Sequence, residues 1–244
     1  DKARAMKAMI LAAGRGERMR PLTDDRPKPL LEVGGRSLLA WHLIALARAG
    51  IGEVVINLSW QGAKIPAALG DGSAFGLRIR YSDEGPVALE TGGGIFRALP
   101  MLGPQPFLLV NGDVWCDYDF AGAPRLDAEA LAALVLVPNP PQHPRGDFGL
   151  ARRPSTAVSV PTSSHDVIDA PDVTPRYTYS GIGVYRAEFF DGCVDGRFPL
   201  LPLLQRAAAA GRLRGELHQG AWSDVGTPQR WRDLDDRLGS AAVG

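Results

Sequence analysis

The chain has 244 residues, and its 27 lysine and arginine residues are balanced by 27 aspartate and glutamate residues. This balance argues against a general nucleic-acid or membrane surface, and the length suffices for one large α/β domain with a substantial core. The two cysteines, Cys116 and Cys193, lack metal-ligand spacing and favour a cytoplasmic protein over a disulfide framework. The four histidines are scattered, so the sequence contains no zinc motif.

The first half of the chain alternates apolar runs with amphipathic segments. Its patterns predict strands over residues 6–13, 53–58, 77–81 and 106–110. They predict helices over residues 37–50, where Ser37 is the expected cap, 61–69 and 91–99. Strands that alternate with helices of this length indicate a mostly parallel sheet, whose ligands bind at the carboxyl ends of the strands.

The second half is less regular. Its patterns predict strands over residues 131–137, 147–151, 177–185 and 221–225, and helices over 200–210 and 229–238. Residues 153–175 are rich in proline, serine, threonine and aspartate, which predicts a mobile loop, a lid over the substrate, or a hairpin. Without an internal repeat or boundary, residues 6–240 are interpreted as one domain, and residues 1–5, before Met6, as leader or added residues.

A glycine-rich turn follows the first predicted strand. The apolar run stops at Gly14, and Gly16 comes two residues later. Such a turn lets successive backbone N–H groups point at anionic oxygens. The cations Arg18, Arg20 and Lys28 follow, the last of them between two prolines that hold it in place. A turn with solvated arginines is the alternative, but the prolines favour a phosphate site.

Two aspartates follow predicted strands in a similar way. Asp113 comes after an apolar strand and Gly112, and Asp224 comes shortly before Gly226. Two carboxylates that converge on a phosphate loop match what Mg²⁺ uses together with substrate oxygens. Each is by itself typical of a turn residue, and for Asp224 alone the turn is favoured. Considered with the glycine-rich turn, both are predicted to bind metal.

Weaker signals lie in two other stretches. Residues 89–94, with three consecutive glycines before the predicted helix, are expected to receive a base or sugar against the backbone, with a flexible linker as the alternative. In the second half, Gly146-Asp147 and Ser180-Gly181 are weak signals when each is taken alone. Small residues in strands are more often packing positions or bulges.

The first of these motifs resembles that of a known family. The pattern L-A-A-G-x-G-x-R-x-x-P-L-T followed by P-K-P-L stands between Leu11 and Leu30, with Glu17 where many relatives carry threonine. It resembles the sugar-1-phosphate nucleotidyltransferases. The resemblance implies a Rossmann-like three-layer α/β fold with a mostly parallel central mixed sheet. Its N-terminal half would bind the nucleotide and its C-terminal half the sugar.

The resemblance also implies roles for single residues. Arg18 and Lys28 would neutralise the triphosphate, and Asp113 and Asp224 would bind the catalytic Mg²⁺. The nucleotide would contact Leu11, Ala12, Ala13, Gly14, Gly16, Glu84, Glu90, Thr91 and Gly92. The sugar would contact Asn111, Gly146, Asp147, Ser180 and Gly181. Many relatives have glycine where Glu90 stands, which leaves its role open.

The implied reaction is attack by a sugar 1-phosphate oxygen on the α-phosphorus of UTP, with pyrophosphate as the leaving group. The motifs around residues 17–23, 89–95 and 111–115 are most similar to those of uridylyltransferases of bacterial cell-wall sugar recycling. Alternatives are another sugar 1-phosphate, choline phosphate with CTP, or a non-catalytic nucleotide-sugar sensor. No nucleic-acid or membrane partner is expected, and the chain is expected to be a monomer or small homo-oligomer.

Overall fold

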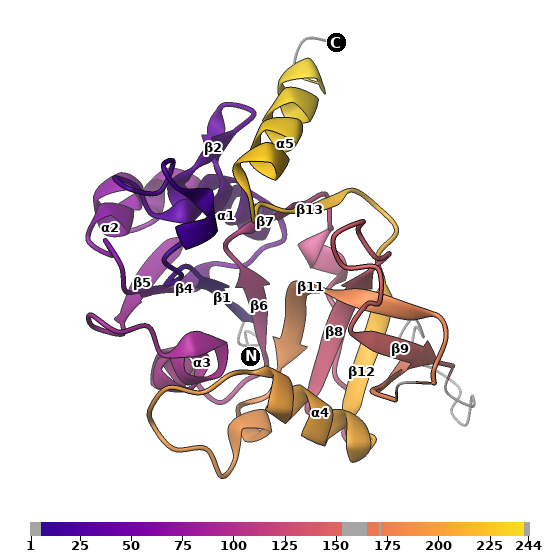
Figure 1. The fold of residues 1–244 in the computed structure, drawn as a ribbon. Coiled ribbons are helices and arrows are strands. Elements are labelled where there is room, and N and C mark those ends of the chain that lie inside the picture. Colours follow the sequence, from indigo (N-terminus) through magenta and orange to yellow (C-terminus); the bar gives the residue numbers. More distant parts are fainter. Residues whose placement is uncertain (1–5, 153–164, 171, 242–244) are drawn as a thin grey trace.

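A nine-stranded sheet forms the centre of the molecule in the computed structural model, which describes residues 6–152, 165–170 and 172–241 (Figure 1). The strand order is β5-β4-β1-β6-β11-β8-β12-β10-β9. The bounds along the chain are β1 Lys7–Leu11, β4 Glu53–Leu58, β5 Arg78–Asp83, β6 Phe107–Asn111, β8 Ala132–Val137, β9 Phe148–Ala151, β10 His165–Ile168, β11 Arg176–Tyr185 and β12 Leu213–Leu217.

The sheet changes character across its width. Strands β5, β4, β1 and β6 are all parallel, with Ile10 level with Ile56 and Val110. Beyond them, β11 is antiparallel to β6, β8 and β9, and β10 is antiparallel to β12 and β9. Strands β11 and β10 therefore run against the other strands of the sheet, and the sheet is mixed, with its parallel part at the N-terminal side.

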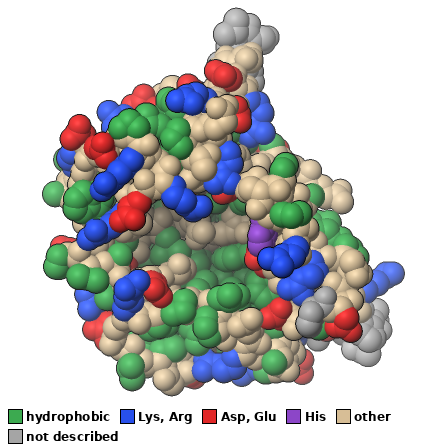
Figure 2. All heavy atoms as spheres, viewed as in Figure 1, with side chains coloured by type: hydrophobic (Ala, Val, Ile, Leu, Met, Phe, Trp, Pro, Cys, Tyr) green, Lys and Arg blue, Asp and Glu red, His purple; other side chains and the backbone are tan. Residues whose placement is uncertain are grey.

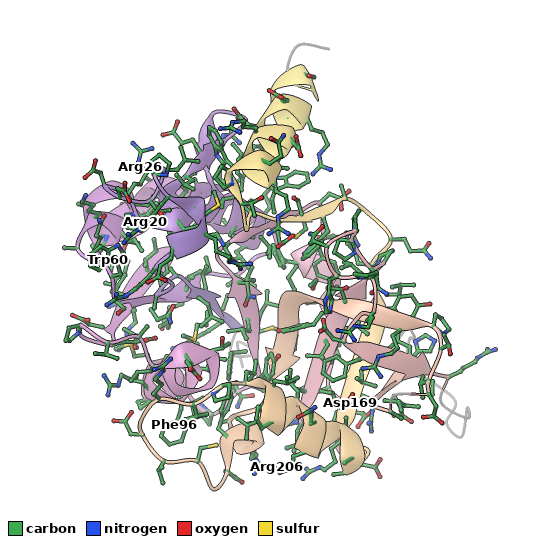
Figure 3. All side chains as sticks on the ribbon, viewed as in Figure 1. Arg20, Arg26, Trp60, Phe96, Asp169 and Arg206 are labelled. Carbon is green, nitrogen blue, oxygen red and sulfur yellow. The ribbon has the colours of Figure 1, made fainter. Side chains whose placement is uncertain are left out.

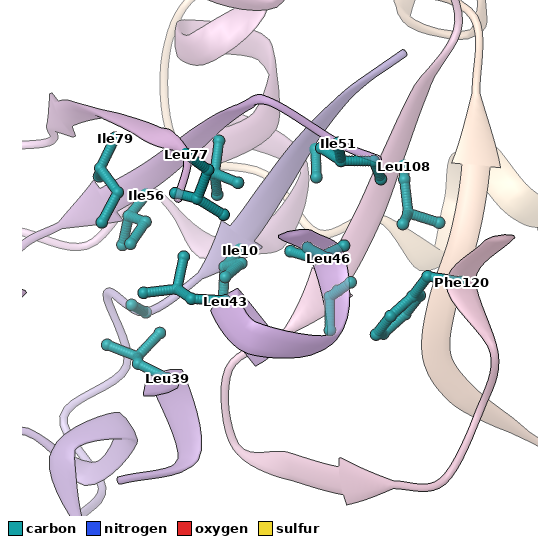
Figure 4. Packing of buried hydrophobic residues seen from close by; sticks show 14 of the residues in the cluster. Ile10, Leu39, Leu43, Leu46, Ile51, Ile56, Leu77, Ile79, Leu108 and Phe120 are labelled. Atoms are coloured by element: carbon teal, nitrogen blue, oxygen red, sulfur yellow. The ribbon is translucent and has the colours of Figure 1, made fainter. Parts of the chain in front are cut away.

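Helices cover both faces of the sheet. Helices α1 (Leu38–Arg48) and α2 (Lys64–Leu69) pack on one face, and α3 (Glu90–Leu102) and α4 (Leu201–Ala209) on the other. Successive residues of β1 enter opposite cores, because Ile10 packs under α1 (Figure 4), whereas Met9 packs under α3. Burial of both faces explains why the parallel strands are continuous apolar runs rather than alternating ones.

A smaller unit lies above the edge of the sheet. Strands β7 (Val114–Cys116) and β13 (Trp222–Asp224) form an antiparallel pair, and β2 (Glu32–Val33) pairs with β3 (Arg36–Ser37). Helix α5 (Pro228–Ala241) packs there through Leu234 and projects from the top of the molecule in Figure 1. Its contacts complete a third core, made of Met19, Leu31, Val33, Leu38, Val225 and Leu234.

The predicted α/β fold is confirmed, with corrections to single elements. The first strand ends at Leu11 rather than residue 13, and α3 continues past the predicted end to Leu102, with Pro100 inside it. Ser37 caps α1 as predicted, accepting a hydrogen bond from the Ala40 N–H at 3.2 Å. Strands β2, β3, β7, β10 and β12 were not predicted, because they are short or interrupted by charged residues such as Arg214.

The segment 153–175 is partly described. Residues 165–168 form β10, which is antiparallel to β9, so the hairpin alternative agrees with the described part. Residues 153–164 and 171, on which the lid prediction depends, lie outside the described residues. Over the part of the chain that the structure describes, none of the helices combines the length and apolar character needed to cross a membrane.

Candidate active site

A cavity of about 180 Å³ opens at the carboxyl ends of the parallel strands. Leu11 ends β1, Asn111 ends β6, and Asn57 stands one residue before the end of β4. Figure 2 shows a hollow in the middle of the molecule, between the two halves. The cavity is lined by Leu11, Ala12, Ala13, Gly14, Lys28, Pro29, Asn57, Glu84, Ala88, Glu90, Thr91, Asn111 and Asp113. Ten of the residues predicted for the site are among them.

The glycine-rich turn forms the wall above the cavity. Gly14 is exposed and lines it, so its backbone is open to a ligand. Gly16 has φ +65°, and a Cβ there would lie 3.0 Å from Thr23 Cγ2 and from Lys28 Cβ. The Thr23 hydroxyl donates to the Gly16 carbonyl at 2.8 Å and closes the turn. Gly16 therefore shapes the loop, whereas Gly14 presents its backbone to the cavity.

The arginines of this loop lie outside the cavity. Arg18 is exposed and is not among the lining residues. The Arg15 guanidinium stacks over the Trp60 ring at 5.3 Å, which fastens the loop to the chain before α2. Figure 3 shows Arg20, Arg26 and Trp60 near one another at the upper left, in the N-terminal half. These cations form an outer rim, outside the lining of the cavity.

Lys28 and Asp113 meet inside the cavity. The Lys28 ammonium lies 2.6 Å from an oxygen of Asp113, across 85 positions of sequence. The Lys28 side chain is 10% exposed and the Asp113 side chain 43% exposed. The short turn Lys28–Leu30, which follows Pro27, holds the lysine there. The sequence did not predict this pair, because its members lie far apart in the chain. The carboxylate offsets the charge of the nearly buried lysine.

A chain of hydrogen bonds supports the floor of the cavity. The Asn57 side chain accepts from the Ala12 N–H at 2.6 Å and donates to Glu84 at 2.6 Å. The other Glu84 oxygen accepts from the Leu89 N–H at 2.7 Å. The buried Glu84 carboxylate therefore connects the loop after β5 with strand β4 and, through Asn57, with the loop after β1. Asn57 was missed by the sequence analysis, although a polar residue near the end of an apolar strand is a usable signal.

The three consecutive glycines allow close packing around α3, while Glu90 and Thr91 of the same segment line the cavity. The glycines lie inside α3, where Gly92 and Gly93 are buried under the segment 196–198. A Cβ on Gly92 would lie 2.5 Å from the Phe198 ring, and one on Gly94 would lie 2.3 Å from a Glu84 oxygen. These glycines therefore permit close packing of protein against protein, and Gly92 is not among the cavity-lining residues.

Glu90 begins α3 with φ +61°, a left-handed conformation that disfavours residues other than glycine. Its carboxylate pairs with Arg197 at 2.8 Å. The conformation gives a physical reason for the glycine found there in many relatives. The side chain of Glu90 lines the cavity but is oriented by the arginine.

The backbone segments that carry Asp224 and Asp113 lie side by side. The Val225 N–H donates to the Asp113 carbonyl at 2.9 Å, and Asp224 stands opposite Val114 in the β7–β13 pair. The Asp224 carboxylate, however, lines a second cavity of about 210 Å³ under α5. Among the described residues no group of three or more histidine, cysteine, aspartate or glutamate side chains is placed to hold a metal. Two carboxylates fit Mg²⁺ only if substrate phosphates and water complete its shell.

The residues predicted for the sugar make internal contacts. Ser180 is buried in a bulge of β11, where its hydroxyl donates to the Val135 carbonyl at 2.6 Å. Gly181, with φ +83°, lies against the Asn111 side chain, which lines the cavity. Asp147 accepts from the Tyr179 N–H at 2.7 Å and contacts His143, and Gly146 has φ +62°. Only Asn111 and its neighbour Gly181 are thus close to the cavity.

Behind β7, His42 is buried in α1. Its Nε2–H donates to the Val114 carbonyl at 2.8 Å. Burial lowers the pKa of His42 from 6.5 to about 4, against smaller opposing effects of the Val114 contact and the Asp113 charge. The ring is neutral at pH 7. Both cysteines are free thiols, and burial raises the pKa of Cys116 to about 11, so this thiol is unreactive.

Comparison with known proteins agrees with this geometry. An N-acetylmuramate alpha-1-phosphate uridylyltransferase of Neisseria meningitidis serogroup B is 48% identical over 96% of this chain and 99% of its own. The enzyme of that description from Caulobacter vibrioides is 36% identical over 96% and 97%. A mannose-1-phosphate guanylyltransferase of Mycobacterium tuberculosis is 32% identical over 91% of this chain and 61% of its own.

The fold has a close structural counterpart as well. A Bacillus anthracis protein assigned as a glucose-1-phosphate thymidylyltransferase superposes with a TM-score of 0.75 at 20% identity, over 98% of this chain and 95% of its own. The family profile described as Nucleotidyl transferase matches residues 7–239. With a glycine-rich loop, a buried lysine and a strand-end aspartate around one cavity, the chain belongs to the nucleotidyl transferase family.

Proposed function

We propose that the protein transfers the uridylyl group of UTP to N-acetyl-α-muramate 1-phosphate, giving UDP-N-acetylmuramate and pyrophosphate. An oxygen of the sugar phosphate attacks the α-phosphorus of UTP, and the bond from that phosphorus to the bridging oxygen of pyrophosphate breaks. The observation that carries the proposal is the 48% identity to an enzyme of that description over nearly both whole chains. The guanylyltransferase relatives are more distant and longer than this chain.

The residues around the cavity fit this chemistry. The reaction needs no nucleophile from the protein, so catalysis depends on positioning and on charge. The open backbone of Gly14 is suited to the phosphates and base of UTP. Lys28 would leave Asp113 and contact the triphosphate, because a phosphate oxygen then replaces the carboxylate as its partner. Arg18 would join from the outer rim as the loop closes.

We also propose that Asp113 and Asp224 hold Mg²⁺ together with substrate oxygens. The ion would orient the two phosphate groups and offset their charge. Support comes from the donor chemistry, since both side chains are carboxylates, Asp113 directly before β7 and Asp224 on the strand β13 that pairs with it. Release of Asp113 from Lys28 would free one oxygen ligand when the triphosphate takes the lysine. Lys28 and Asp113 therefore exchange partners when the substrate binds.

The biological setting proposed is peptidoglycan recycling in the cytoplasm, where a cell-wall sugar phosphate is activated for reuse. Asn111 and Gly181, at the edge of the cavity that faces β11, are the proposed sugar contacts. Gly146, Asp147 and Ser180 would act there through the backbone or through the loop that they stabilise, since their side chains already have partners or are absent.

The test is a substrate panel followed by release of pyrophosphate. UTP, CTP, GTP and dTTP are each paired with N-acetylmuramate 1-phosphate, glucose 1-phosphate, mannose 1-phosphate and choline phosphate. We expect the highest kcat/KM for UTP with N-acetylmuramate 1-phosphate, and a requirement for Mg²⁺. A higher value for glucose 1-phosphate would contradict the sugar assignment. Tight binding of UTP without turnover of any acceptor would instead favour a nucleotide-sugar sensor.

A further inference from the structure

Both oxygens of the Asp224 carboxylate already have hydrogen-bond donors. Gln142, on the loop between β8 and β9, donates to one oxygen at 2.6 Å. The Arg230 guanidinium, in the first turn of α5, lies 3.1 Å from the other oxygen. The two donors bind different oxygens of the carboxylate and come from segments 88 positions apart in the chain. They restrict how the carboxylate can rotate.

Several features hold Arg230 at this place. The Thr227 hydroxyl accepts from the Arg230 N–H at 3.3 Å at the beginning of α5. Gly226 leaves the space that the guanidinium occupies, because a Cβ on this residue would lie 1.9 Å from Arg230 Nη2. The Arg230 side chain is 20% exposed, and its Nε is buried without a hydrogen-bond partner among the described residues. The Thr227 contact and the space at Gly226 therefore hold the Arg230 side chain in this position, although its Nε–H has no hydrogen-bond acceptor among the described residues.

A carboxylate has about four lone-pair positions on its two oxygens. One donor on each oxygen leaves further positions for a metal ion and fixes the plane of the group. Partners of this kind orient metal-binding side chains, and their loss typically costs ~10–100-fold in metal affinity. We propose that Arg230 is a positioning residue, which holds the Asp224 carboxylate in the orientation that binds the divalent cation, and that Gln142 assists it. This inference rests on the proposed metal site at Asp113 and Asp224.

An opposite effect of Arg230 is physically reasonable and must be separated from the proposal. A guanidinium is positively charged, so it repels a divalent cation and competes with it for Asp224. If competition outweighed orientation, removal of Arg230 would tighten metal binding. If the arginine only anchored α5, its removal would lower thermal stability and leave metal affinity unchanged. The sign of the change in metal affinity therefore distinguishes three roles.

The experiment measures Mn²⁺ binding by electron paramagnetic resonance in the presence of an α,β-imido analogue of UTP, which is not turned over. We expect Arg230→Gln to weaken Mn²⁺ binding by ~10–100-fold and Arg230→Lys to weaken it less. The matched control is Arg232→Gln, which removes the same charge from an exposed residue of the same helix. It should bind Mn²⁺ like the parent. Turnover measured against Mg²⁺ concentration should show the same order.

A second variant guards against a folding defect in the first. Gly226→Ala keeps the arginine but fills its space, so the flexible guanidinium must move, and the new Cβ would also lie 3.1 Å from Asp224 Oδ2. This variant should weaken Mn²⁺ binding, and adding Arg230→Gln to it should cause no further loss. A Gly226→Ala/Arg230→Gln variant that loses affinity additively, or an Arg230→Gln variant with unchanged or tighter Mn²⁺ binding, would overturn the proposal. Asp224→Asn is the reference: if it also leaves Mn²⁺ binding unchanged, the metal site itself is misassigned.

Discussion

The two halves of the molecule present polar groups to the central cavity in different ways. In the N-terminal half, β5, β4, β1 and β6 are parallel, so their carboxyl ends and the loops that follow meet at one edge. In the C-terminal half, β11 and β10 run against their neighbours, and polar side chains such as Ser180 and Asp147 are used within the sheet and its loops. The parallel strands bring the residues that line the cavity to one edge of the sheet. The polar side chains of the antiparallel part mainly make hydrogen bonds within the protein.

This difference assigns the two halves different work. The N-terminal half supplies the cavity wall, with Lys28 and Asp113 as its charged pair. The C-terminal half supplies Asp224 and the donors that surround it, Gln142 and Arg230. Loss of Lys28 in the first half should therefore lower turnover without changing metal binding, whereas loss of Asp113 in the first half or of Asp224 in the second should act through metal binding. The predictions below test this division, from the largest expected effect to the smallest.

The largest effect should follow Asp113→Asn, which keeps the shape of the side chain and removes its charge. We expect turnover to fall by about a hundredfold or more, the scale that is measured when one well-placed electrostatic group is lost. Excess Mg²⁺ should recover part of the loss, because weaker binding is offset by mass action. The measurement is kcat as a function of Mg²⁺ concentration.

The matched control for this variant is Asp236→Asn, an exposed residue of α5. It changes the same charge far from the cavity and should turn over at the parental rate. If Asp113→Asn also turned over at the parental rate, Asp113 would not belong to the catalytic machinery. Lys28→Met should lower turnover too, but added Mg²⁺ should not restore it, since the missing charge belongs to the protein.

The two members of the Lys28–Asp113 pair should differ in their effect on stability. Asp113→Asn leaves a nearly buried ammonium beside a neutral amide, which should cost about 1–3 kcal/mol of unfolding free energy. Lys28→Met removes the buried charge itself and leaves a carboxylate that is 43% exposed to water, so its cost should be smaller. Urea denaturation without ligand gives both values.

The double variant Lys28→Met/Asp113→Asn is the check on that asymmetry. It should be more stable than Asp113→Asn alone, because no charge remains buried without a partner. Equal stability of the two single variants would mean that Lys28 is hydrated in solution rather than enclosed.

Acidification should weaken the N-terminal half through His42. Its pKa is about 4 in the folded protein and near 6.5 when unfolded, so the unfolded chain takes up the proton first as the pH falls. Stability is therefore fully present above about pH 7 and declines towards pH 4, with a loss of about 2 kcal/mol at pH 5. Urea unfolding at pH 7, 6 and 5 measures the decline.

His42→Gln should be less stable than the parent at pH 7, because the Val114 contact is altered, but its decline between pH 7 and pH 5 should be flatter. An unchanged slope in this variant would assign the acid sensitivity to other groups.

The success of the sequence-based predictions also differs between the two halves. The motif around Gly14, the position of Lys28 and the strand end at Asp113 were local signals, and parallel topology brings them to one cavity. Partners that come from distant segments were not predictable. Lys28 and Asp113 are 85 positions apart in the chain. The contact between Gly226 and the Arg230 guanidinium is visible only in the folded structure. The packing role of the glycines in α3 could not be distinguished from a ligand contact in the sequence, because close packing and ligand contact both favour glycine.

The smallest effect concerns Glu90, whose role the sequence left open. Its φ of +61° is left-handed, and glycine adopts that conformation without the cost of about 1 kcal/mol that other residues bear. Its ion pair with Arg197 is partly exposed on both sides and should contribute less than that. Glu90→Gly should therefore be as stable as the parent or slightly more stable. Glu90→Ala, which loses the pair and keeps the strained backbone, should be less stable than Glu90→Gly by about 1 kcal/mol in urea denaturation. A Glu90→Ala variant as stable as Glu90→Gly would show that the backbone relaxes, and a raised KM for UTP in both variants would assign the carboxylate to nucleotide binding instead.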